Sequence, residues 1–384
     1  MNTILVNLIL LILYTYFGYF LAVILLGKLF RKKVLKENIE PHVTLLIAAY
    51  NEEKSIAQKI QNSLNLDYPK EKFRIIVVSD ASSDATDDIV RSYESHGVEL
   101  LRVEGRVGKT EARNVAMTQI EGDIIIFSDA TTTYQPDVVR KFVRNFADPH
   151  VGMVTGQLIY KNAENTQMGI GQVLYWKYET LIKKSQTAMG TLTGSVGCAT
   201  AFRKSLYTPL PKNIIEDFTG PLMLVLKGFR VVYEEEAICF EETTKKSKQE
   251  WDMRVRVIRG GMKGMLHAKK ILNPVVYPVP FFQLMSHKIL RWLIPVFMVL
   301  LFIVNNYLVM TNPEDYIAKI LLALQFGFYM TALISYLLEK RGIHLKLAAI
   351  PLYFIVLNAA SFVALYKTFT SELESTWETN REDQ

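Results

Sequence analysis

The chain has 384 residues, of which 50% are hydrophobic and 21% charged, and its formal net charge at pH 7 is +6. The hydrophobic residues concentrate near both ends, which is not the distribution of a single soluble domain. No nucleic-acid-binding motif accompanies the positive charge, so we expect no nucleic-acid partner. The two cysteines, Cys198 and Cys239, have no spacing typical of a metal site or a redox pair, and we expect buried thiols.

The first predicted element is an almost uncharged stretch at residues 4–26. It is long enough to cross a hydrocarbon core of about 30 Å as a helix. No small-residue cleavage site follows it, so we expect a retained membrane span rather than a signal peptide. The residues that come next are rich in lysine and arginine, and short basic loops of this kind stay in the cytoplasm.

The middle of the chain alternates apolar, strand-like runs with helix-like segments, which predicts βαβ units and a parallel sheet. The first three runs cover residues 43–47, 75–78 and 124–127. Farther along, we expect strands at residues 151–159 and 229–233. Between those two strands lie an aromatic-rich helix at residues 170–184 and a loop rich in glycine, serine and threonine at residues 190–197.

Three further apolar stretches of spanning length lie near the C-terminus, and the loops between the spans differ in charge. Basic residues precede the second span and separate the third from the fourth, whereas acidic residues separate the second from the third and fill the tail. The prediction is therefore a multi-pass protein of the cell (inner) membrane, with a cytoplasmic middle region and both termini outside. The predicted parts are a span at residues 1–27, a cytoplasmic domain at 28–275, an interfacial segment at 276–292, three spans within 293–367 and an acidic tail at 368–384.

Each of the first three strands ends in a polar turn that carries a carboxylate. The turns are residues 48–53, residues 79–84 and a turn that begins with Asp129. Ligands bind at the carboxyl ends of parallel strands. Such an edge can hold a polyanionic nucleotide through a metal ion and hydrogen bonds. Alone, residues 48–53 would equally suit a surface turn with a helix cap, and Asp84 is better explained as a helix-capping charge.

In this order, the elements resemble the family 2 glycosyltransferases. The resemblance covers residues 43–261 and is to the membrane-embedded branch with cellulose, hyaluronan and poly-N-acetylglucosamine synthases and ceramide glucosyltransferases. It implies an α/β domain of the GT-A type, with a mostly parallel sheet and flanking helices, plus helical transmembrane segments. The implied reaction is an inverting transfer from a nucleotide sugar, with UDP as the expected nucleotide.

The resemblance also implies which residues bind the donor. By their match to the family's motifs, Ala48, Tyr50 and Glu52 would contact the base and ribose, Asp80 the base, Lys109 the diphosphate and Asp129 the metal. A lysine offers a point charge to phosphate oxygens. Asp129 matches the first aspartate of the family's Asp-X-Asp, but Thr131 stands where a second aspartate is usual. Mg²⁺ or Mn²⁺ is the expected cofactor, because few protein ligands plus phosphates suffice to hold it.

The acceptor side is implied by two further matches. Glu216 and Asp217 resemble the family's Thr-Glu-Asp motif, which makes Asp217 the expected general base. The alternative is that this pair caps the helix predicted at residues 218–227. Residues 253–257 occupy the position of the family's Gln-X-X-Arg-Trp, where only the arginine is retained. The residues expected near the acceptor or the diphosphate are Glu216, Arg254, Arg256, Arg259 and Trp251, the last as a substitute for the missing tryptophan. Residues 242–246 fit either the family's gating loop or a solvated charge run.

The expected partners are a UDP-sugar, a glycan or lipid acceptor and the bilayer. A growing exopolysaccharide or related glycan is favoured as acceptor. The alternative is a polyprenyl phosphate, diacylglycerol or ceramide, because about four spans are few for a pore made by one chain. Export of a polymer would then need a second copy or an export partner. A non-catalytic nucleotide-binding protein is a weaker interpretation, since Asp80, Asp129 and Asp217 are all present. A nucleotide-dependent oxidoreductase is weaker still, since no Gly-X-Gly-X-X-Gly follows the first strand.

Overall fold

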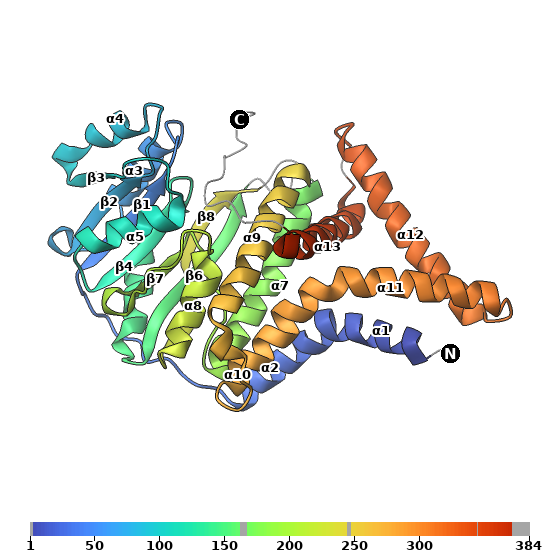
Figure 1. The fold of residues 1–384 in the computed structure, drawn as a ribbon. Helices are drawn as coiled ribbons and strands as arrows, with labels where there is room; N and C mark the ends of the chain where they lie inside the picture. Colours follow the sequence, from blue (N-terminus) through green and yellow to red (C-terminus); the bar gives the residue numbers. More distant parts are fainter. Residues whose placement is uncertain (1–2, 162–166, 244–246, 344, 371–384) are drawn as a thin grey trace.

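The computed structural model describes residues 3–161, 167–243, 247–343 and 345–370. These residues form one eight-stranded sheet, helices on both of its faces and a group of long apolar helices (Figure 1). The strands are β1 (Val43–Ala49), β2 (Phe73–Ser79), β3 (Val98–Arg102), β4 (Ile124–Asp129), β5 (Thr133–Tyr134), β6 (Val151–Lys161), β7 (Thr200–Arg203) and β8 (Arg230–Glu242). Their order across the sheet is β3-β2-β1-β4-β7-β6-β8-β5.

The sheet is mixed rather than mostly parallel. β3, β2, β1 and β4 run parallel to one another, and β6 is parallel to β8. β7 is antiparallel to both of its neighbours, and β5 is antiparallel to β8. The half of the sheet with the three predicted strands is thus the parallel one. The carboxyl ends of β1, β2 and β4 consequently lie next to one another at one edge.

The helix predicted at residues 170–184 extends past both of its predicted ends, and the one predicted at residues 218–227 begins two residues earlier and ends one residue earlier. The helices are α1 (Thr3–Leu13), α2 (Tyr19–Leu29), α3 (Ile56–Leu64), α4 (Thr86–Arg91), α5 (Lys109–Gln119), α6 (Val138–Val143), α7 (Gln167–Met189), α8 (Glu216–Leu226), α9 (Ser247–His267), α10 (Pro278–Gln283), α11 (Leu290–Thr311), α12 (Tyr316–Glu339) and α13 (Lys346–Thr370). Short 3₁₀ segments lie at Lys70–Lys72, Glu94–His96, Arg144–Ala147, Lys204–Leu206 and Lys269–Leu272. The π-helical segments Tyr14–Gly18 and Leu284–Ile289 join α1 to α2 and α10 to α11.

Both faces of the sheet are buried, which explains the continuous apolar runs of β1, β2 and β4. Successive side chains of a strand point to opposite faces. In β1, Leu45 and Ile47 therefore join a core with α3, α4 and α6, whereas Leu46 joins a second core with α5 and α8. The second core also includes Trp292 of α11, whose ring lies 5.9 Å from that of Phe218 in α8. One apolar helix is thus packed directly on the core of the α/β part.

Within the described residues, four helical stretches are long and apolar enough to cross a membrane, as predicted: Thr3–Leu29, Pro278–Thr311, Tyr316–Glu339 and Lys346–Thr370. The second stretch is longer than expected, because α10 and the π-helical segment continue into α11. The segment proposed at residues 276–292 is therefore the beginning of this helical stretch rather than a separate element.

Helix α7 lies between the sheet and the apolar helices, as does α9 (Figure 1). Helix α7 contacts both the first and the last apolar stretch, and a glycine permits each close approach. A Cβ on Gly27 of α2 would meet the backbone of Ser185, and a Cβ on Gly171 would meet the ring of Tyr353 in α13. The positions of α2 and α13 consequently fix that of α7.

Candidate active site

A chamber of about 900 Å³ opens at the carboxyl ends of β1, β2 and β4 and extends to α7, α9 and the start of the second apolar stretch. Adjacent parallel strands bring its residues together, since Ala48 pairs with Asp129 and Ala49 with Ser79. The predicted residues that line the chamber are Ala48, Tyr50, Glu52, Asp80, Lys109, Asp129, Asp217, Arg254 and Arg256. The residues predicted for the donor and the predicted base thus share one cavity.

Asp80 holds the turn that leads into α5. Its two carboxylate oxygens accept hydrogen bonds from the backbone N–H groups of Val107, at 2.8 Å, and Gly108, at 2.9 Å. Gly108 has a φ of +92°, a conformation that residues with a Cβ avoid. Lys109 follows as the first residue of α5. Asp80 therefore positions the glycine and lysine of the expected diphosphate-binding passage.

The turns after β1 and β2 are tied together at the same end of the chamber. Asn51 has a φ of 51°, and its side-chain oxygen accepts a hydrogen bond from the backbone N–H of Ser83 at 2.9 Å. Asp84 accepts hydrogen bonds from the backbone N–H groups of Glu53 and Thr86, so it stabilises these turns.

Two aromatic or acidic side chains of the first turn complete this end of the chamber. The Arg106 guanidinium lies over the Tyr50 ring, 4.1 Å from its centroid. Glu52 accepts a hydrogen bond from the Ser55 hydroxyl at 2.5 Å. Tyr50, Glu52 and Arg106 carry aromatic or charged groups of the kind that can contact a base and ribose. All three line the chamber, as does Ser55.

A buried arginine joins Asp129 to the Glu216–Asp217 motif. Arg113 of α5 is 0% exposed, and its guanidinium lies 2.6 Å from Glu216 Oε2 and 3.2 Å from Asp129 Oδ1. Lys109 Nζ is 2.6 Å from the same Asp129 oxygen. Burial alone would raise the pKa of Asp129, but Lys109 and Arg113 hold it below its usual value. Burial raises the pKa of Glu216 despite the contact with Arg113.

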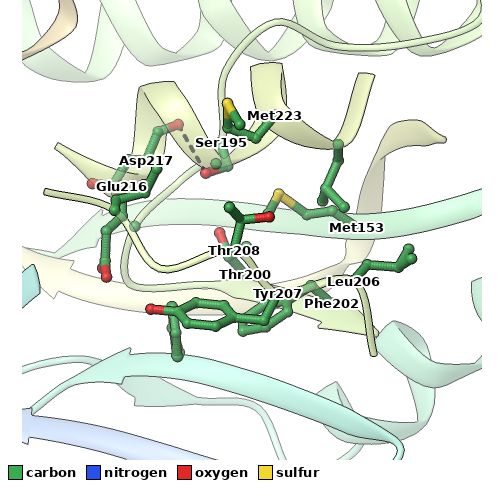
Figure 2. Close-up of a pocket in the computed structure, with 15 residues that line it drawn as sticks. Met153, Ser195, Thr200, Phe202, Leu206, Tyr207, Thr208, Glu216, Asp217 and Met223 are labelled. Atoms are coloured by element: carbon green, nitrogen blue, oxygen red, sulfur yellow. Dashed lines mark hydrogen bonds between the residues drawn. The ribbon is translucent and has the colours of Figure 1, made fainter. Parts of the chain in front are cut away.

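Asp217 lies in the first turn of α8 and is held by its backbone. Its carbonyl oxygen accepts hydrogen bonds from the N–H and the hydroxyl of Ser195, at 2.8 and 3.0 Å. Figure 2 shows this contact. The N-cap residue of α8 is Ile215, and no side-chain hydrogen bond caps this helix. No side-chain hydrogen bond therefore supports the alternative in which the Glu216–Asp217 pair caps α8.

Glycine backbones pack against the acidic motif from two sides. A Cβ on Gly197 would overlap the Asp217 carboxylate, and a Cβ on Gly260 of α9 would overlap the side chain of Ile215. On its other side, the motif borders a small, mainly apolar cavity of about 40 Å³ (Figure 2). Met153, Phe202 and Leu206 line that cavity together with Glu216, Asp217 and Ser195.

The remaining predicted residues fall into two groups, since Arg254 and Arg256 line the chamber whereas Trp251 and Arg259 do not. Arg256 lines the chamber near Asp217 and Asp129; burial lowers its pKa and these two carboxylates oppose the shift. Arg254 also lines it, but its guanidinium is held by Glu250 at 2.7 Å and by the Tyr353 hydroxyl at 3.0 Å.

Trp251 and Arg259 are not among the residues that line the chamber. Trp251 packs in a cluster with Val255 of α9 and Ala360 and Ala364 of α13. Arg259 donates to the carbonyl of Lys367 at 3.4 Å. Both side chains therefore contact α13, and neither lines the chamber in which an acceptor or a diphosphate was expected. Of the proposed gating segment, Glu242 and Thr243 line the chamber, whereas residues 244–246 lie outside the described residues.

Sequence reasoning did not identify several charged residues near Asp129. Arg113 is one, although its position on α5, four residues after Lys109, places both cations on one face. Lys59 is 1% exposed and donates to the carbonyl of Thr132 at 2.7 Å; burial lowers its pKa to about 7. Glu241 accepts a hydrogen bond from the Thr132 hydroxyl at 2.7 Å, and burial and then Asp129 raise its pKa.

The residues around Asp129 suit a cation shared with a ligand. Among the described residues, no three histidine, cysteine, aspartate or glutamate side chains gather as metal ligands. Mg²⁺ at phosphate sites is typically held by one or two carboxylates plus the phosphates themselves. Oδ1 of Asp129 faces Lys109 and Arg113, and the carboxylate lines the chamber. The donor set fits a cation that arrives with a diphosphate better than a preformed metal site.

The chamber thus combines cations suited to phosphate with the carboxylates of Asp129 and Asp217, at the sheet edge where α/β proteins bind ligands. Comparison with known proteins agrees. Residues 44–209 match the model for the Glycosyl transferase family 2. This part of the chain is therefore similar to the glycosyltransferases of that family.

Two groups of known proteins extend the comparison. The poly-beta-1,6-N-acetyl-D-glucosamine synthase of Staphylococcus aureus (strain COL) is 31% identical over 230 residues, which are 58% of this chain and 55% of that protein. The synthase of the same name from Staphylococcus epidermidis is 27% identical over 230 residues. The match thus spans about half the length of these curated relatives. Among solved structures, the mannosyltransferase PcManGT from Pyrobaculum calidifontis, in complex with GDP-Man and Mn²⁺, has a TM-score of 0.71 at 20% identity and covers 95% of this chain and 99% of that one. This likeness shows the GT-A fold.

Proposed function

We propose that the chain is a membrane glycosyltransferase that transfers a sugar from a UDP-linked donor to a growing exopolysaccharide or related glycan. The observation that carries the proposal is the shared chamber, which Lys109, Asp129 and Asp217 all line. The names of the curated relatives support N-acetylglucosamine as the first sugar to test.

In the proposed reaction, Asp217 takes the proton of an acceptor hydroxyl. The acceptor oxygen attacks the anomeric carbon as the bond to the diphosphate breaks, so the configuration inverts and UDP leaves. Lys109 would neutralise charge on the departing diphosphate, and Arg256 would add positive charge from α9. Asp129 would hold the divalent cation, which supplies further charge neutralisation at the diphosphate when bound.

The direct test is an assay of the purified full-length protein in detergent. UDP- and GDP-sugars would be supplied one at a time with Mg²⁺ or Mn²⁺, and both released nucleotide and product would be measured. We expect release of UDP from UDP-N-acetylglucosamine and a product with a new glycosidic bond. Absence of transfer from every sugar nucleotide would refute the proposed activity.

A lipid acceptor is the second candidate, and one feature favours it. The chamber extends to His287 and Lys288 at the start of the second apolar stretch, so an acceptor could enter from the bilayer. Including a polyprenyl phosphate in the assay separates this candidate from a glycan acceptor.

We further propose that the chamber faces the cytoplasm of a cell (inner) membrane and that both ends of the chain lie outside. The support is the distribution of cations around the four apolar stretches. A cysteine introduced at the exposed residue Glu94 should react with a maleimide that cannot cross membranes only after the cells are opened. Labelling of this cysteine in intact cells would reverse the proposed orientation.

Asp129→Ala should remove the metal dependence of donor binding. Without this carboxylate, the cation loses its proposed protein ligand, whereas Lys109 and Arg113 still attract the diphosphate. Calorimetric titration of the full-length protein with UDP should show that Mn²⁺ tightens binding to the wild type but not to the variant. Asp88→Ala, at an exposed ion pair on α4, is the control and should retain the Mn²⁺ effect. An equal Mn²⁺ effect in wild type and Asp129→Ala would exclude Asp129 as the metal ligand.

A further inference from the structure

One face of α7 forms a wall of the chamber. The residues on it recur at the spacing of a helix: Gln172, Tyr175, Trp176, Glu179, Lys183 and Gln186 all line the cavity. This wall lies outside residues 253–257, where sequence comparison placed the acceptor motif. Apart from their aromatic content, nothing in the sequence marks these residues as functional.

The polar residues at one end of this wall have protein partners. Glu179 Oε1 lies 2.5 Å from Arg291 and 3.1 Å from His287, and Gln186 donates to the Tyr19 hydroxyl at 2.8 Å. These contacts join α7 to α2 and to the second apolar stretch. Their hydrogen bonds account for the burial of polar side chains at this end of the wall.

The other end of the wall differs. Gln172 is 1% exposed, yet its side-chain oxygen has no hydrogen-bond partner among the described residues. The indole N–H of Trp176, one helical turn farther on, is also buried without a partner there. Buried polar groups are nearly always paired, so two unpaired ones on adjacent turns of a cavity wall require an explanation. One atom is an acceptor and the other is a donor, and a hydroxyl group can satisfy both.

We propose that Gln172 and Trp176 form a subsite that binds hydroxyl groups of the acceptor sugar. This inference rests on the proposed function and identifies the acceptor as a carbohydrate. The Trp176 ring is held by neighbouring aromatic rings, with its centroid 6.0 Å from that of Tyr160 and 6.3 Å from that of Tyr175. The Lys183 ammonium lies 4.3 Å from the ring centroid. A tryptophan fixed in this way presents an apolar surface and a polar edge, which matches the two kinds of surface on a sugar.

The position of Trp176 also accounts for the missing tryptophan of the Gln-X-X-Arg-Trp motif. Trp251 packs against α13, and Val257 lines the chamber where the motif would place its tryptophan. Trp176 lines the same chamber from α7. In this chain the aromatic side chain at the acceptor would therefore come from a different helix.

Trp176→Phe and Gln172→Met test the subsite in the full-length protein. Methionine has nearly the size of glutamine and phenylalanine keeps an aromatic ring, and each variant removes the unpaired atom. The probe is an oligosaccharide of β-1,6-linked N-acetylglucosamine. We expect its KM and its calorimetric Kd, measured without donor, to rise about 3- to 10-fold in each variant, which is the usual worth of one neutral hydrogen bond. UDP affinity should remain that of the wild type.

Trp251→Phe is the matched control, because Trp251 is not among the residues that line the chamber, and it should leave the oligosaccharide Kd unchanged. Thermal unfolding separates binding from packing. In the near-isosteric Gln172→Met, loss of an unpaired polar atom should not lower the unfolding midpoint, whereas a residue needed only for packing would lower the midpoint without changing the Kd.

The outcomes distinguish this inference from the proposed function. Wild-type binding of the oligosaccharide that weakens in both variants supports the subsite, even if no transfer occurs and the proposed activity fails. An oligosaccharide Kd that is unchanged in both variants overturns the subsite, even if transfer is observed. A wild-type protein that does not bind the oligosaccharide and glycosylates only polyprenyl phosphate also overturns it.

Discussion

Asp217→Asn is expected to lower the turnover of sugar transfer by about 10²- to 10⁴-fold, the usual contribution of a general base. An amide cannot take the proton of the acceptor hydroxyl, yet it has nearly the shape of the carboxylate. The donor is proposed to bind through Lys109 and Asp129 rather than through Asp217, so the affinity for UDP should stay close to that of the wild type. The measurements are single-turnover transfer rates and calorimetric titration with UDP.

A second variant displaces the Asp217 carboxylate without replacing this residue. A methyl group in Gly197→Ala would overlap the Asp217 carboxylate and force it to move, so turnover should fall while Asp217 itself is retained. Gly194→Ala is the matched control, since a Cβ there meets no other atom of the described residues within 4 Å. Near-normal turnover in Asp217→Asn would mean that another group is the base.

Arg113→Met is expected to have the largest effect on stability, a loss of about 3 to 5 kcal/mol in the free energy of unfolding. The guanidinium is fully buried and contacts both Asp129 and Glu216. Its removal would leave the Glu216 carboxylate buried without its cation. Breaking one side of a buried ion pair costs more than the pair itself contributes, because the remaining charge is uncompensated. Denaturant unfolding of the full-length protein in detergent measures the loss.

Two controls define the cause. Arg91→Met breaks an exposed pair with Asp88 and should change stability by no more than about 0.5 kcal/mol. The double variant Arg113→Met with Glu216→Gln should recover part of the lost stability, because the uncompensated carboxylate is gone. If the double variant is less stable than Arg113→Met alone, the loss comes from packing and not from charge.

The part of the fold that could be predicted is the part with strong local signals. The runs of valine and isoleucine in β1, β2 and β4 are buried on both faces of the sheet, and such strands remain continuous and apolar in sequence. β3 was not predicted, since its alternating sequence of five residues is short and lies at the edge of the sheet. β8 extends to Glu242, well past the predicted end at residue 233, because three consecutive glutamates interrupt the apolar pattern.

The site was predictable where a motif lies at the end of a strand or the start of a helix. Asp80, Lys109, Asp129 and Asp217 line one chamber for this reason. On a long helix, by contrast, the orientation of a side chain depends on its packing partners. Arg259 and Trp251 of α9 face α13, and no local pattern shows which of several arginines turns toward the cavity.

The close contacts of α7 with α2 and α13 have a practical consequence for dissecting this protein. A chain trimmed to residues 28–275 would keep every motif of the glycosyltransferase domain. It would nevertheless lose the helices that Gly171 and Ser185 touch, as well as Trp292 from the core behind α8. The catalytic part is thus not a detachable module that happens to be tethered to a membrane. His287 and Lys288 of the second apolar stretch line the chamber directly, and α7, which forms another part of its lining, packs against α2 and α13.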